Sequence, residues 1–120
     1  MCDLIIQSLN HIITSILTEH TLRNEPTISI ITVNYNGLGM TIDLLHSIER
    51  QSYKNVEVFV VDNASKEDPS LYLSKNFPKV RCIRSEKNLG FAGGNNLAVR
   101  EAKGDFLFLI ITQRRFQRNI

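Results

Sequence analysis

The stretch that decides the fold is ISIITVNYNG, residues 28–37, together with its counterpart VEVFVVDNAS, residues 56–65. Each begins with a run of apolar, largely β-branched residues and ends in a polar cluster. Such runs predict buried strands of a parallel sheet. Because the carboxyl ends of neighbouring parallel strands open into one crevice, we expect Tyr35 and Asp62 to face the same ligand. A carboxylate at this place suits a nucleoside, since it accepts hydrogen bonds from ribose hydroxyls or a base N–H.

Outside these two strands, helical and strand-like segments alternate along the chain. The expected elements are strands at 28–33, 56–61, 80–84 and 106–111, and helices at 39–51, 69–76 and 92–103. Pro69 suits the first turn of a helix, where its missing N–H costs nothing, and Gly104 is a natural stop. This βαβαβαβ order predicts a Rossmann-like parallel sheet with right-handed crossovers and helices on both faces.

The composition is that of one ordinary domain. Of the 120 residues, 42% are hydrophobic and 22% charged, and the formal net charge is +2. A charge so close to balance gives no case for a nucleic-acid partner. The scattered cysteines and histidines lack metal-ligand spacing, and isolated thiols are typical of a cytosolic chain. These residues, from which we predict no metal site, are Cys2, Cys82, His11, His20 and His46.

The first residues predict an amphipathic helix followed by a linker. Apolar side chains recur at the spacing of one helix face, at Leu4, Ile5, Ile6, Leu9, Ile12, Ile13, Ile16 and Leu17. The apolar runs are too short to cross a bilayer, and Asp3 stands where a signal peptide needs positive charge. We expect the helix to dock onto the domain, with peripheral membrane contact as the alternative. The predicted organisation is a helix and linker at 1–27, a domain at 28–111 and an atypical basic tail at 112–120.

The loop after the first strand offers binding groups without a dinucleotide fingerprint. Ile42 stands where a G-x-G-x-x-G pattern would need glycine, which argues against nicotinamide chemistry. Tyr35 has a ring to stack on a base, although Asn and Gly are also common in ordinary turns. An ionised Asp62 after four apolar residues needs a partner, which could be a ligand. Alternatively, Asp62 or Asn63 caps the following turn.

The third cluster, residues 86–96, combines glycines with a basic residue. It precedes a helix, so backbone N–H groups, the helix dipole and Lys87 could attract a diphosphate. The alternative is a tight loop packed for shape.

The three clusters, in this order and spacing, resemble the family 2 glycosyltransferases with the GT-A fold. The matching segments are ISIITVNYNG from Ile28, VEVFVVDNAS from Val56, EKNLGFAGGNN from Glu86 and EAKGDFLFL from Glu101. The likeness is greatest to rhamnosyltransferase-like members that build surface polysaccharides. It implies an inverting transferase that takes a UDP-, dTDP- or GDP-linked sugar for polysaccharide or glycoconjugate synthesis.

The resemblance also implies roles for individual residues. Val33, through its backbone, and Tyr35 would hold the nucleoside, while Asp62 would bond the base or ribose and Asn63 would support the turn. The loop that would close over the nucleotide and approach the diphosphate includes Asn88, Gly90, Gly93 and Gly94.

The chain departs from the family pattern after the fourth strand. There the family has an acidic D-x-D-type motif that binds Mg²⁺ or Mn²⁺ on the sugar diphosphate, whereas residues 110–114 are IITQR. We therefore expect no metal site and no cofactor in this chain. We also expect no catalytic residue, because the family's general base lies beyond this point.

The last residues, TQRRFQRNI at 112–120, break the apolar periodicity and the charge balance. We expect a truncated or frame-shifted N-terminal half of a cytoplasmic transferase, inactive alone and in peripheral contact with the membrane at most. The alternatives are a non-catalytic nucleotide-binding or interaction module, and an unstable chain that self-associates through the open edge of its sheet.

Overall fold

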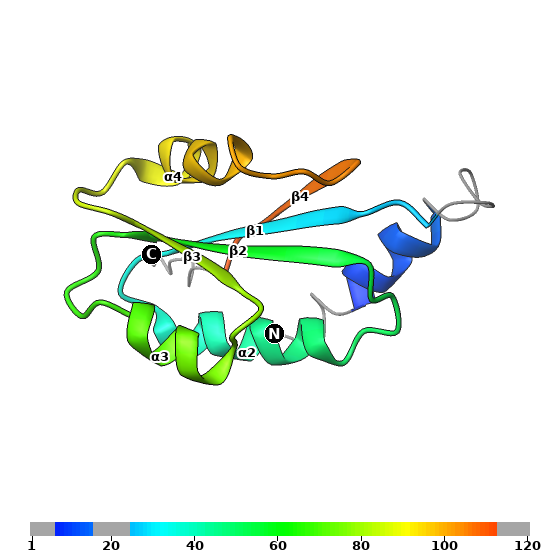
Figure 1. Cartoon of the computed structure of the whole chain (residues 1–120), viewed down its shortest axis with the longest axis horizontal. Helices are drawn as coiled ribbons and strands as arrows, with labels where there is room; N and C mark the ends of the chain where they lie inside the picture. Colours follow the sequence, from blue (N-terminus) through cyan, green and yellow to red (C-terminus); the bar gives the residue numbers. More distant parts are fainter. Residues whose placement is uncertain (1–6, 16–24, 113–120) are drawn as a thin grey trace, which may run out of the picture.

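The computed structural model describes residues 7–15 and 25–112, and it confirms the predicted alternation of strands and helices. Residues 7–15 are helical. The elements that follow are β1 (Ile28–Asn34), α2 (Leu38–Glu49), β2 (Val56–Asn63), α3 (Ser70–Asn76), β3 (Arg81–Ser85), α4 (Gly90–Val99) and β4 (Phe106–Ile110) (Figure 1).

The boundary that differs most from expectation is that of α4. Residues 92–103 were expected to be helical, but α4 begins at Gly90 and ends at Val99. The amides of Glu101 and Ala102 both bond to the carbonyl of Ala98, and this turn ends the helix. Gly93 therefore lies inside the helix.

The sheet is parallel, with the strand order β3-β2-β1-β4. In the register of β1 with β2, Ile28 pairs with Val56 and Asn34 with Asp62. The polar clusters that follow the two strands therefore lie side by side. The chain order reverses at β1, between β2 and β4, and such a switch point is where open α/β sheets bind ligands.

Helices cover both faces of the sheet, as predicted. Figure 1 shows α2 and α3 below the strands and α4 above them. The core between the sheet and the α2–α3 layer includes Ile28, Ile30 and Val60. The smaller core between the sheet and α4 includes Ile31 and Val61. The central strands β1 and β2 thus pack with one face against α2 and α3 and with the other face against α4.

The described part of the N-terminal helix docks onto the sheet, which is the favoured expectation. Leu9 and Ile13 are buried in the larger core, where Phe108 and Ile110 of β4 also pack. Ile12, expected on the same apolar face, is exposed. The other predicted positions of that face and the tail at 113–120 lie outside the described residues. No helix within 7–15 and 25–112 is long and apolar enough to span a bilayer.

Candidate functional site

A pocket of about 140 Å³ opens at the carboxyl ends of β1, β2 and β4, beside the start of α4. Its lining residues are Val33, Tyr35, Asn63, Asn88, Gly90, Phe91, Ile111 and Thr112. The structure thus brings together most of the predicted binding residues, from segments far apart in the sequence. Three lining residues were missed. Phe91 lies within the quoted glycine-rich motif, and Ile111 and Thr112 follow β4, whose carboxyl end was a signal for them.

The lining of this pocket is uncharged and partly aromatic. The side chains of Tyr35 and Phe91 are 42% and 45% exposed, so both rings are accessible to a ligand. The polar side chains in the lining are the hydroxyls of Tyr35 and Thr112 and the amides of Asn63 and Asn88. Aromatic rings with amides nearby suit a flat, uncharged group that stacks and makes a few hydrogen bonds.

Asn63, the last residue of β2, holds the loop before α4. Its Nδ2 donates to the carbonyl of Gly90 at 2.9 Å, and the amide of Leu89 donates to its Oδ1 at 3.2 Å. Asn88 Oδ1 accepts from the amide of Gly90, whose φ of +77° favours glycine. The expected role of Asn63 was to support the turn after β2. The structure shows it supporting the neighbouring glycine-rich loop instead.

Gly94 and Gly93 lie behind this loop and do not line the pocket. A Cβ at Gly94 would lie 3.0 Å from Asn63 Nδ2 and 3.2 Å from a methyl of Val33. Gly94 therefore lets α4 pack closely against the ends of β1 and β2, and so brings the loop over the pocket.

Asp62 lies beneath the pocket and outside its lining, with 0% of its surface exposed. Its Oδ1 accepts from Asn34 Nδ2 at 2.8 Å and from Ser65 Oγ at 2.6 Å. Its Oδ2 accepts from the Ser65 amide at 3.0 Å and from Arg84 Nη1 at 2.5 Å. The bond to the Ser65 amide is the turn cap considered from the sequence. Both carboxylate oxygens of Asp62 thus have intramolecular partners. A contact between Asp62 and a ligand stays a prediction.

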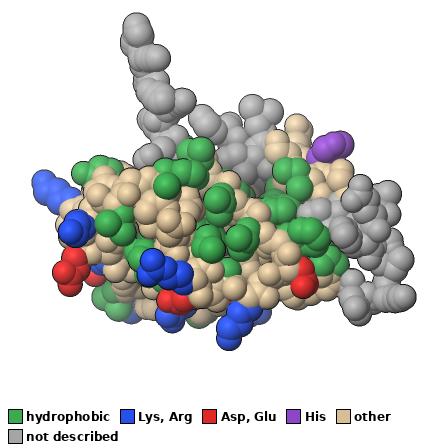
Figure 2. Space-filling model, turned by 90° about the horizontal axis from the view of Figure 1, so that it is seen from above, with side chains coloured by type: hydrophobic (Ala, Val, Ile, Leu, Met, Phe, Trp, Pro, Cys, Tyr) green, Lys and Arg blue, Asp and Glu red, His purple; other side chains and the backbone are tan. Residues whose placement is uncertain are grey.

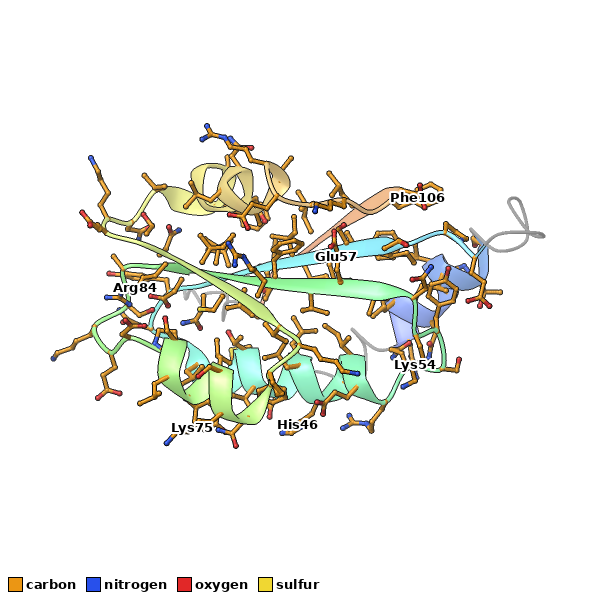
Figure 3. All side chains as sticks on the ribbon, in the orientation of Figure 1. His46, Lys54, Glu57, Lys75, Arg84 and Phe106 are labelled. Atoms are coloured by element: carbon orange, nitrogen blue, oxygen red, sulfur yellow. The ribbon has the colours of Figure 1, made fainter. Side chains whose placement is uncertain are left out.

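Arg84, at the carboxyl end of β3, was not singled out in the sequence. Figure 3 shows it at the end of the sheet where the strands run into the loops. Besides Asp62, its guanidinium contacts the carbonyl of Ser65 at 3.1 Å and Asp68 at 3.7 Å. The register of β2 with β3 pairs Asp62 with Arg84, and the residue types alone gave no signal for this pairing.

The loop that carries Tyr35 is held from both sides. Asn34 is buried, and its Oδ1 accepts from Thr41 Oγ1 at 2.7 Å. The amide of Asn36 donates to Ser65 Oγ at 2.8 Å, and its Oδ1 accepts from the Lys66 amide at 2.8 Å. Asn36 has a φ of +52°, a conformation that Asn tolerates better than most residues. Ser65 joins the turns after β1 and β2.

The residues of the pocket do not fit a divalent metal ion. Mg²⁺ and Mn²⁺ sites are built from carboxylates and other hard oxygen ligands. No acidic side chain lines the pocket, and residues 7–15 and 25–112 contain no cluster of three His, Cys, Asp or Glu that could hold a metal. The pocket can bind a neutral planar group, but it does not supply a metal site.

Comparison with known proteins shows what the chain is similar to in sequence. The model of the family described as "Glycosyl transferase family 2" matches residues 29–111. An uncharacterized glycosyltransferase of Haemophilus influenzae is 40% identical over 83 residues, which cover 69% of this chain and 28% of that protein. The Escherichia coli UDP-Glc:alpha-D-GlcNAc-diphosphoundecaprenol beta-1,3-glucosyltransferase WfaP is 31% identical over 81 residues, 67% of this chain and 32% of its own length. The chain thus spans about a third of the length of these relatives.

Two solved structures have the same fold. Staphylococcus aureus TarS 1-349 in complex with UDP superposes with a TM-score of 0.63 at 27% identity, covering 72% of this chain and 27% of TarS 1-349. The mannosyltransferase PcManGT from Pyrobaculum calidifontis, solved with GDP-Man and Mn²⁺, gives a TM-score of 0.62 at 20% identity, covering 88% of this chain and 36% of PcManGT. The predicted GT-A type of α/β fold is confirmed by these neighbours.

Proposed function

The chain belongs to glycosyl transferase family 2, and we propose that its pocket binds the nucleoside part of a nucleotide-diphosphate sugar. The observation that carries the proposal is the pocket at the switch point of the sheet, with two accessible aromatic rings and no charged lining residue. A nucleobase is flat and neutral, so it matches this lining better than a diphosphate does.

In this proposal the base stacks on Tyr35 and Phe91. Val33 contributes backbone groups at the end of β1, and the amide of Asn88 is available at the mouth of the loop. The diphosphate then extends toward the start of α4, where the helix dipole and Lys87 favour negative charge. UDP is the first nucleotide to test, since TarS is solved with UDP and WfaP is named for UDP-Glc.

We further propose that the described chain binds the nucleotide without transferring the sugar. Departure of a nucleoside diphosphate needs its developing charge neutralised, usually by a metal held on carboxylates. The pocket offers no such carboxylate, so binding of the nucleoside does not depend on Mg²⁺ or Mn²⁺. The whole enzyme to which such a domain belongs would act in polysaccharide or glycoconjugate synthesis, as the name of WfaP suggests.

The test is a calorimetric titration of the whole chain with UDP, dTDP, GDP and uridine, each with Mn²⁺ and with EDTA. We expect binding of at least one nucleotide, with similar affinity in both conditions, and measurable binding of the free nucleoside. Tyr35→Ala should weaken binding about tenfold, because a base–aromatic stack contributes roughly 1–3 kcal/mol.

Tyr72→Ala is the matched control, since Tyr72 is about equally exposed but lies on α3. If none of the three nucleotides binds, or if both tyrosine variants weaken binding equally, the proposed pocket is wrong. Sustained release of UDP from UDP-glucose in the presence of Mn²⁺ would contradict the proposed lack of transfer.

We also propose that the chain self-associates through β4. Among the described strands, β4 pairs only with β1, which leaves its other edge without a partner strand. Leu107 and Leu109 of this strand are 46% and 45% exposed, and Ile111, which follows it, is 62% exposed. Figure 2, which looks onto the face that carries α4, shows hydrophobic side chains gathered over its middle. An apolar edge strand without charges or proline is prone to pair with another chain.

A further inference from the structure

We infer that Arg84 is a positioning residue of the pocket, which acts through Asp62 and Ser65 on the loop that carries Tyr35. The inference concerns the conformation of this loop. Only its effect on nucleotide affinity rests on the proposed function.

A continuous series of short contacts leads from Arg84 to the loop. Arg84 Nη1 donates to Asp62 Oδ2 at 2.5 Å, and the other oxygen of Asp62 accepts from Ser65 Oγ at 2.6 Å. Ser65 Oγ in turn accepts from the amide of Asn36 at 2.8 Å. A second branch runs from Asp62 Oδ1 to Asn34 Nδ2 at 2.8 Å. Asn34 and Asn36, the residues on the two sides of Tyr35, are thus bonded to the Asp62 carboxylate, the first directly and the second through Ser65.

Asp62 requires the positive charge of Arg84. Its carboxylate is fully buried, and the other groups that donate to it, on Asn34 and Ser65, are neutral. A buried charge that loses its ionic partner is strongly unfavourable, so the groups around it must rearrange. Such a rearrangement moves the carboxylate oxygen to which Ser65 Oγ and Asn34 Nδ2 donate.

The guanidinium contributes more than charge. Arg84 also donates to the carbonyl of Ser65 at 3.1 Å, so one planar group holds the carboxylate and the backbone of the following turn together. The ammonium group of lysine is a compact point charge and does not reproduce this fork. Lysine at position 84 should therefore keep the ion pair but loosen the turn.

The effect on the pocket follows from the backbone of the Tyr35 loop. Asn36 is held at a φ of +52° while its amide bonds to Ser65. Without that bond the loop can relax to a negative φ, which redirects the neighbouring Tyr35 ring. Arg84 does not line the pocket, so its influence on a ligand is indirect.

Arg81 provides a matched control on the same strand. Arg81 Nε pairs with Glu101 at 2.8 Å, and both side chains are largely exposed. Neither residue lines the pocket or contacts the Tyr35 loop. Arg81→Met removes a cation and an ion pair from β3 without touching the Asp62 system.

The experiment compares Arg84→Met, Arg84→Lys and Arg81→Met in the whole chain. The first measurement is the backbone amide NMR spectrum without nucleotide. We expect the signals of Tyr35 and Asn36 to move strongly in Arg84→Met, less in Arg84→Lys, and not in Arg81→Met. The second measurement is UDP affinity, which should fall at least tenfold in Arg84→Met, less in Arg84→Lys, and stay within twofold in Arg81→Met.

The double variant Asp62→Asn/Arg84→Met covers the case in which Arg84→Met does not fold, because it leaves no buried charge unpaired. We expect its Tyr35 and Asn36 signals to be displaced as well. If these signals in Arg84→Lys and in the double variant superimpose on those of the unmodified chain, the inference is wrong. If the unmodified chain binds neither UDP, dTDP nor GDP, the proposed function fails, while the NMR comparison still decides the role of Arg84.

Discussion

Asp62 and Asn63 are neighbours in the sequence but have different roles at the end of β2. Side chains of successive strand residues point to opposite faces of a sheet. Asn63 reaches the loop before α4 and lines the pocket, whereas Asp62 bonds to Asn34, Ser65 and Arg84 beneath it. Asp62 thus joins the turns after β1 and β2 to β3, while a ligand contact by Asp62 stays a prediction, and its neighbour Asn63 lines the pocket.

The burial of Asp62 predicts a large effect on stability. Asp62→Ala removes the acceptor of the buried donors on Ser65 and Asn34, so the free energy of unfolding should fall by about 1–3 kcal/mol. Arg84 itself is partly exposed and keeps its contact with Asp68. Glu101→Ala, which breaks the exposed pair with Arg81, should have a much smaller effect, because solvent screens that pair. Urea denaturation of both variants measures the difference. Equal losses would contradict a structural role of Asp62.

Glu57 predicts how stability depends on pH. Burial raises the pKa of its carboxyl, but hydrogen bonds from the Ser29 hydroxyl and the amides of Lys103 and Gly104 outweigh this and hold the pKa below its usual 4.5. A lowered pKa in the folded state means that the ionised group stabilises the fold above the unfolded pKa. This contribution should be lost as the pH falls from about 4.5 through the folded pKa.

The variant Glu57→Gln tests this pH dependence. It keeps an oxygen that can accept from Ser29 but no longer titrates. Its urea midpoint should therefore change less than that of the unmodified chain between neutral pH and about pH 3. Parallel curves for the two proteins would show that Glu57 does not contribute to the acid sensitivity.

At the scale of elements, the junction before β4 depends on close backbone contact. A Cβ at Gly104 would lie 2.5 Å from Ser29 Oγ, 2.7 Å from the Ser29 amide nitrogen and 2.9 Å from the carbonyl of Thr27. Two of these atoms belong to the backbone of β1 and its approach, so they cannot move aside easily. Gly104 thus lets β4 lie close beside β1. It does not end the preceding helix, as the sequence had suggested, because α4 already ends at Val99.

The contrast between two glycines makes this contact testable. Gly104→Ala should lower the free energy of unfolding by about 3 kcal/mol, because the added methyl overpacks against backbone. Gly39→Ala, in the first turn of α2 with open space around its Cβ position, should raise it by up to about 1 kcal/mol through helix propensity. Thermal denaturation of both variants shows whether each stabilises or destabilises the fold. A destabilised Gly39→Ala together with a neutral Gly104→Ala would contradict the close contact at Gly104.

At the scale of the whole molecule, β4 is covered unequally. Its Phe108 and Ile110 pack with Leu9 and Ile13 of the N-terminal helix in the larger core. On the opposite face α4 packs over β1, β2 and β3, so the side chains of β4 there stay exposed. The exposed side chains of Leu107, Leu109 and Ile111 therefore lie on or next to the strand whose outer edge has no partner strand among the described elements.

The proposed self-association predicts a concentration-dependent assembly. Leu109→Lys places a charge on the exposed face of β4 and should shift sedimentation toward the monomer. Leu71→Lys, on an exposed position of α3, is the control and should leave the distribution unchanged. Analytical ultracentrifugation over a range of concentrations measures the monomer fraction of both variants and of the unmodified chain. If the unmodified chain is monomeric at all concentrations, the proposed self-association is wrong.

Much of this architecture was predictable from the sequence, because its signals are local. Apolar runs such as 28–33 and 56–61 are long enough to indicate buried strands, and helical periodicity fills the intervals. The end of α4 was placed too late, since residues 100–102 form a turn on Ala98 that has no strong sequence signal. The pocket residues Val33, Tyr35, Asn63, Asn88 and Gly90 could be named because each lies at a strand end or in a glycine-rich loop.

The sequence by itself determined the order of the elements, the parallel sheet and the end of that sheet at which binding groups gather. It determined these because hydrophobic periodicity and turn chemistry act over a few residues. Only the tertiary structure decided that Asp62 is buried with Arg84 while Asn63 forms the pocket wall. That outcome depends on the register of β2 with β3 and on contacts between residues more than twenty positions apart, which side-chain types alone do not specify.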